Sequence, residues 1–199
     1  EHHRHALLEY MALGLSLGPL ALLLAASLLR ARRLRDALYG WYALHALVAM
    51  LALAAFTGVA AHLFWGDAVG WVDGAGGSLA LLAATLAAGI VARLGAVRTR
   101  MRGIAGWLHL LCGLGVLFVA LYLVVPRGIG VLLLAIHLFS VSVLCLCAAA
   151  ATWRRGDPVG LWLLLAILPM AAAVVLAMAR AAGLLPSFWL TEYALVLAL

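Results

Sequence analysis

The sequence predicts an all-α membrane protein, a seven-transmembrane helix bundle with its N-terminus outside and its seventh helix truncated by the end of the fragment. Three observations predict this fold. Of the 199 residues, 68% are hydrophobic and only 10% are charged, whereas soluble domains are about 45–50% apolar and about 25% charged. The apolar residues form runs of the length that spans a bilayer, about 20 residues, and most arginines fall between the runs. We therefore expect lipid to surround most of the surface.

The predicted spans divide the whole chain, residues 1–199, which forms a single transmembrane domain. They cover approximately residues 8–29, 38–61, 77–97, 104–125, 129–151, 159–181 and, incomplete, 189–199. We expect each span to be a helix, because lipid cannot satisfy the open edge of a sheet. Residues 65–78, rich in glycine and aspartate, are expected to form the longest outer loop. The start at Glu1 and the short last run lead us to expect that this segment belongs to a longer protein.

The arginines gather in alternate connections between the spans. The connections after the first, third and fifth spans hold ten of the thirteen basic residues, if Arg93 at the end of the third span is included. By the positive-inside rule these connections face the cytoplasm, so the N-terminus lies outside. The net charge of +6 is thus explained by topology, and we expect no nucleic-acid partner. The residues predicted to determine the topology are Arg30, Arg32, Arg33, Arg35, Arg98, Arg100, Arg102, Arg154 and Arg155.

Small residues and prolines are the candidates for helix contacts and bends. The first span contains a G-x-x-x-G pattern from Gly14 to Gly18, which allows helices to approach closely. Four more glycines, Gly103, Gly106, Gly113 and Gly115, run through the fourth span. Pro19 and Pro169 lie inside the first and sixth spans, where each removes a backbone donor. These two prolines are the candidate hinges, with a static packing bend as the alternative.

Residues able to carry chemistry are few. The sequence contains no phosphate-binding loop, zinc-protease motif or nucleophile elbow, so we expect this segment not to be an enzyme. His45 and His109 lie at similar predicted depths and are the candidate haem ligands. Hydrogen bonds between helices are the simpler role for these histidines and for His137, so we expect no cofactor and no metal. The three cysteines, Cys112, Cys145 and Cys147, fall inside apolar runs and are expected to be packing residues.

The chain resembles the membrane region of the bacterial seven-transmembrane receptors with diverse intracellular signalling modules. Four landmarks in the order of the family carry this resemblance: Arg35-Asp36 with Leu38-Tyr39 and Tyr42, Gly58 with Leu63-Phe64-Trp65, Ala92-Arg93-Leu94, and Gly183-Leu184-Leu185-Pro186 with Thr191 and Tyr193. The chain departs from the family pattern at Gly66, where the family has proline, and at Val91-Ala92, where it has aromatic residues. It departs again at Ser187-Phe188, where the family often has asparagine.

The resemblance implies a function for the segment. Such receptors often carry a periplasmic sensor domain before the first helix and a cytoplasmic output domain after the seventh, commonly a diguanylate cyclase or a histidine kinase. The segment would then be a signal-transducing sensor module of the bacterial inner membrane, in contact with the lipid bilayer. Because such output enzymes act as dimers, we expect a homodimer. The alternative function is a haem-binding or small-solute membrane protein that uses the intramembrane histidines.

Overall fold

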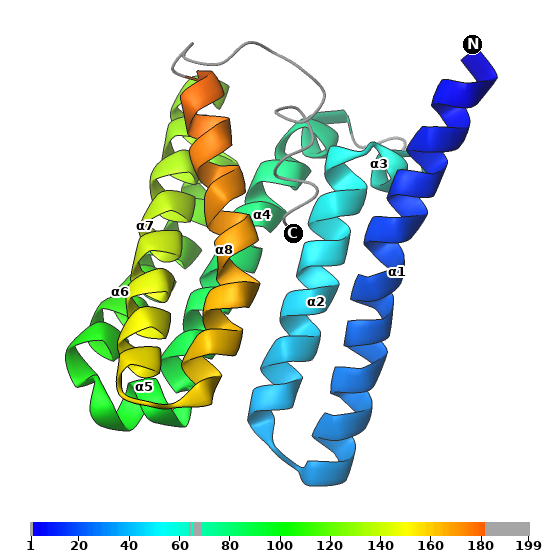
Figure 1. Cartoon of the computed structure of the whole chain (residues 1–199). Helices are drawn as coiled ribbons and strands as arrows, with labels where there is room; N and C mark the ends of the chain where they lie inside the picture. Colours follow the sequence, from blue (N-terminus) through cyan, green and yellow to red (C-terminus); the bar gives the residue numbers. More distant parts are fainter. Residues whose placement is uncertain (1, 64, 66–68, 182–199) are drawn as a thin grey trace.

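The computed structural model describes residues 2–63, 65 and 69–181, and this part of the chain contains helices but no strands. The helices form a bundle of long rods joined by short connections (Figure 1). Their bounds are α1 His2–Leu34, α2 Ala37–Phe56, α3 Val59–Leu63, α4 Val69–Arg93, α5 Gly95–Arg100, α6 Arg102–Tyr122, α7 Arg127–Arg154 and α8 Pro158–Ala181. The predicted all-α fold class is therefore confirmed. The incomplete seventh span, 189–199, lies outside the described residues.

Five helices in the described part of the chain are long and apolar enough to cross a membrane. These candidate spans are Ala37–Phe56, Gly74–Arg93, Arg102–Tyr122, Arg127–Arg154 and Pro158–Leu176. Each overlaps one predicted span from the second to the sixth. The predicted first span, 8–29, lies within α1, which has 33 residues.

The second and third predicted spans differ in detail from the helices observed. The predicted span 38–61 is interrupted, because α2 ends at Phe56 and the five-residue α3 follows. Gly58 between them has a φ of +77°, a left-handed conformation that glycine adopts without steric cost. The third predicted span, 77–97, is interrupted at Leu94, which separates α4 from α5.

The expected outer loop over residues 65–78 is wrong from Val69 onward, because α4 already begins there. Two of the glycines that suggested a loop, Gly76 and Gly77, serve helix packing instead. A Cβ on Gly76 would lie 3.1 Å from the ring of Phe56, and one on Gly77 would overlap the Tyr122 hydroxyl. Because lipid offers no hydrogen bonds to an open backbone, a glycine-rich segment at this depth is more stable as a closely packed helix.

Helix α4 is the centre of the bundle. It packs against α2 on one side and against α6 and α7 on the other, whereas α1 packs mainly on α2 and α8 mainly on α7. Figure 1 shows α1 at one edge of the bundle and α8 apart from it, with α2 between them in this view. Among the described helices, the main contacts between α1 and α8 therefore run through α2, α4 and α7.

The connections that hold most arginines lie together at one end of the bundle (Figure 1). The turn between α1 and α2 contains Arg35, with a φ of 50°, and the Asp36 carboxylate accepts a hydrogen bond from Leu38 N at 2.9 Å. At the next two connections, Nη1 of Arg155 donates to the Arg100 carbonyl at 2.7 Å. This last bond ties the start of the α7–α8 turn to α5.

Candidate functional site

A buried polar joint lies where α4, α6 and α7 meet. Thr85 from α4 and His137 from α7 are 6% and 1% exposed, and their Oγ1 and Nε2 atoms are 3.1 Å apart. Gly115 from α6 packs directly against both side chains, because an added Cβ would overlap Thr85 Oγ1 and lie 2.8 Å from His137 Nε2. Three helices thus meet at one hydrogen bond, and a glycine provides the room for it.

The hydrogen-bond pattern defines which atom of the Thr85–His137 pair donates and which ring nitrogen of His137 carries the proton. Oγ1 of Thr85 also lies 2.7 Å from the Leu81 carbonyl, one turn earlier in α4. A carbonyl oxygen can only accept, so the single hydroxyl proton of Thr85 goes to Leu81, and the hydroxyl oxygen accepts from Nε2–H of His137. Neutral His137 therefore carries its proton on Nε2. Its Nδ1 is buried and has no hydrogen-bond partner among the described residues.

The walls of the joint are apolar or weakly polar. Phe118 presents an edge-to-face contact to His137, with ring centroids 5.8 Å apart and an interplanar angle of 79°. The thiol of Cys112 donates a weak hydrogen bond to the Thr85 carbonyl, with an Sγ–O distance of 3.4 Å. Because burying an unpaired polar atom in an apolar interior costs free energy, the unpartnered Nδ1 lowers the stability of the observed packing.

A second polar contact joins α4 to α2. Nδ1 of His45 lies 3.1 Å from the Ala83 carbonyl, so this ring nitrogen donates. Nearer the arginine-rich end, the Arg93 guanidinium donates to Gly89 O at 3.0 Å and lies 4.3 Å from the centroid of the Trp41 ring. Helix α4 is therefore tied to α2 by one histidine and one cation–π contact, and to α7 by the other histidine.

The two candidate haem ligands do not share a site. His45 points from α2 to the Ala83 carbonyl of α4, whereas Nδ1 of His109 lies 2.7 Å from Ala105 O of its own helix. The His109 side chain is exposed on α6. Within the described residues, no group of three or more His, Cys, Asp and Glu side chains could hold a metal ion. The expectation of no cofactor stays a prediction. In the structure, His45 and His109 do not face each other as two axial ligands of one haem would.

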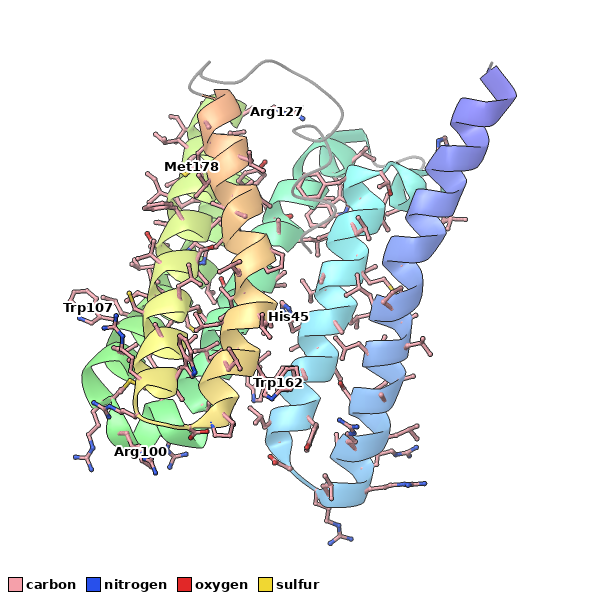
Figure 2. The ribbon with its side chains drawn as sticks, in the orientation of Figure 1. His45, Arg100, Trp107, Arg127, Trp162 and Met178 are labelled. Carbon is pink, nitrogen blue, oxygen red and sulfur yellow. The ribbon has the colours of Figure 1, made fainter. Side chains whose placement is uncertain are left out.

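The nine predicted topology arginines are all exposed. They come from the last two turns of α1 and from the connections at the arginine-rich end. Figure 2 shows Arg100 at that end and Arg127 at the opposite end of the bundle. Which end faces the cytoplasm stays a prediction.

The candidate hinges Pro19 and Pro169 lie inside α1 and α8. Both helices continue through their proline, and both prolines are exposed. Neither proline lies in the polar joint, and their role as hinges stays a prediction.

Sequence reasoning missed Thr85 and the particular importance of Gly115. The sequence does distinguish Thr85 from its neighbours, because it is the only hydroxyl-bearing or charged residue in the apolar run 79–92. An isolated polar residue in such a run usually faces another helix, since lipid cannot satisfy it. The sequence named His137 as a candidate for a contact between helices but gave no partner for it.

Comparison with known proteins gives one match. The family model described as 7TM diverse intracellular signalling matches residues 9–199, nearly the whole chain. No curated protein and no solved structure matches the chain.

Proposed function

Because this chain belongs to the 7TM diverse intracellular signalling family, we propose that it receives a signal outside the cytoplasm and relays it to a cytoplasmic output domain. Family membership and the five apolar helices make it a multi-pass membrane protein associated with intracellular signalling. To that assignment the proposal adds the direction of the signal, the helices through which it passes and the output domain that receives it. It rests on the resemblance for the partner and on the packing of the bundle for the route.

The packing supports a route through α4. A change that begins at α1 reaches α8 mainly through α2, α4 and α7, because α1 and α8 pack on separate neighbours. A ligand can shift output only if it binds two arrangements of the bundle with different affinities. The route therefore needs a contact on α4 that can exist in two states of similar free energy.

The polar joint is the single observation that carries this proposal. Its hydrogen bond between Thr85 and His137 holds α4 to α7 at the place where Gly115 of α6 packs most closely. The unpartnered Nδ1 of His137 reduces the stability of this packing, so a second packing that satisfies it competes with the first. Relative movement of α4 and α7 would exchange the two states and carry the signal across the bundle.

The expected partners come from the family resemblance. We propose a periplasmic sensor domain before α1, an output domain beyond the seventh helix, and a homodimer in the bacterial inner membrane. The output domain would be a diguanylate cyclase or a histidine kinase, and the transmembrane domain itself would catalyse no reaction. A haem-binding function has no support from the geometry of His45 and His109.

The test is the output of the full-length protein when the joint is altered. Gly115→Ala and Thr85→Val should change basal output, measured as cellular cyclic di-GMP and as autophosphorylation, the products of the two expected output classes. Gly113→Ala is the matched control, because an added Cβ there meets nothing within 4 Å. Wild-type output from both joint variants, in protein that is folded and membrane-inserted, would contradict a route through this joint.

A further inference from the structure

A shallow groove lies on the outer face of α6, next to the arginine-rich end. Its volume is about 300 Å³, and it is lined by Arg102, Gly103, Gly106, Trp107 and Leu110. The last four residues have the spacing i, i+3, i+4 and i+7, which places them on one face of a helix. The glycines form the floor of the groove, because a Cβ at either position would meet nothing within 4 Å.

The walls of the groove have two kinds of chemistry. Trp107 and Leu110 are 62% and 51% exposed, and Figure 2 shows Trp107 pointing from α6 away from the bundle. Arg102 is exposed at the first residue of α6, and its guanidinium makes no hydrogen bond or ion pair with any residue that the structure describes. The groove thus combines an apolar trough with one available guanidinium at its end.

We propose that this groove binds an anionic phospholipid, with its phosphate on Arg102 and an acyl chain along Gly103, Gly106 and Leu110. A guanidinium matches phosphate in charge and in hydrogen-bond geometry. Trp107 lies one turn further into the span, where an indole ring covers the upper part of an acyl chain and keeps its N–H near the polar headgroups. This site is independent of the polar joint, which lies on the inward face of the same helix.

The observations favour a lipid over the other possible occupants. Free phosphate would use Arg102 alone and leave the apolar trough unfilled. A second copy of the chain would use the glycine face, but it would bring its own positive Arg102 region close to this one, at an end that already carries ten of the thirteen arginines. Charge complementarity therefore points to an anionic partner that also has an apolar part.

Native mass spectrometry of the full-length protein in detergent tests the proposal. The protein is titrated with phosphatidylglycerol or with phosphatidylcholine that has the same acyl chains. We expect one phosphatidylglycerol to bind in preference to phosphatidylcholine. Arg102→Gln should lower its affinity about fivefold, the effect of one basic residue near an anionic headgroup, without changing phosphatidylcholine binding. Gly106→Leu should fill the trough and lower the affinity for both lipids.

The matched control is Arg32→Gln, an exposed arginine in the last turn of α1 at the same end of the bundle. It should leave the preference for phosphatidylglycerol unchanged. The proposal is overturned if the wild type shows no preference, or if Arg32→Gln and Arg102→Gln reduce it equally, because the effect would then be general surface charge. It is also overturned if Gly106→Leu leaves lipid binding intact but separates two copies of the chain, which would make the groove a dimer contact.

Discussion

Thr85 and His137 are 52 positions apart in the chain, yet the hydroxyl oxygen of Thr85 lies 3.1 Å from Nε2 of His137 in the interior of the bundle. This hydrogen bond is the only one between side chains of different helices that the structure shows within the described residues. It joins the central helix α4 to α7, and a glycine of α6 closes it on the third side. The geometry of this hydrogen bond therefore depends on how α4, α6 and α7 pack together.

Removing the Thr85 hydroxyl should weaken the bundle. Thr85→Val keeps the shape of the side chain but leaves His137 without its acceptor, so the free energy of unfolding should fall by about 0.5–2 kcal/mol, the range for hydrogen bonds between membrane helices. Unfolding by SDS in mixed micelles measures this change. The matched control is Thr152→Val, because the buried Thr152 hydroxyl bonds only to Ala148 O of its own helix. Equal losses in the two variants would show that the Thr85–His137 bond contributes nothing of its own.

Two glycines of α6 that are two residues apart should respond differently to the same substitution. Gly115→Ala places a methyl group against Thr85 and His137, so the free energy of unfolding should fall by about 1–3 kcal/mol through overpacking. Gly113→Ala meets open space and gains helix propensity, so stability should stay the same or rise slightly. The same SDS unfolding experiment measures both. A loss at Gly113 as large as at Gly115 would contradict the close packing described for the joint.

The arginine-rich end should face the cytoplasm. The test uses a protein in which Cys112, Cys145 and Cys147 are replaced, with a single cysteine introduced as Thr99→Cys or as Gly128→Cys. Both positions are exposed, at opposite ends of the bundle. A membrane-impermeant maleimide applied to intact cells should label position 128, and position 99 should react only after permeabilisation. The reverse pattern would invert the predicted topology.

The purified protein should show no Soret absorbance. His45 donates to the Ala83 carbonyl, and His109 is bonded to its own helix on an exposed face, so the two rings do not offer a pair of axial ligands. The absorbance spectrum is recorded after expression with added haem precursor. A Soret band that disappears in His45→Ala or in His109→Ala would establish the alternative function and remove the basis of this prediction.

The sequence by itself determined the fold class and the pattern of charge. Membrane insertion depends on the summed hydropathy of each segment and on the charges that flank it. Both are properties of residues that are neighbours in the sequence, so the sequence is enough to predict them. Four short motifs in the order of the family indicated the family from the sequence, and the family match over residues 9–199 confirmed it. The end of each helix was less predictable. The helix is interrupted at Leu94 and near Gly58, although both residues lie inside runs that are predominantly apolar.

The tertiary structure alone decided which side chains meet. Gly113 and Gly115 are equivalent in composition and hydropathy, but one faces open space and the other faces Thr85 and His137. Residues 69–78 have the composition of a loop, yet they begin a helix because Gly76 and Gly77 pack against Phe56 and Tyr122. Hydropathy does not encode these differences, because lipid and a neighbouring helix are almost equally apolar. The inward face of a membrane helix is selected by close packing and by the few polar groups that must find a partner.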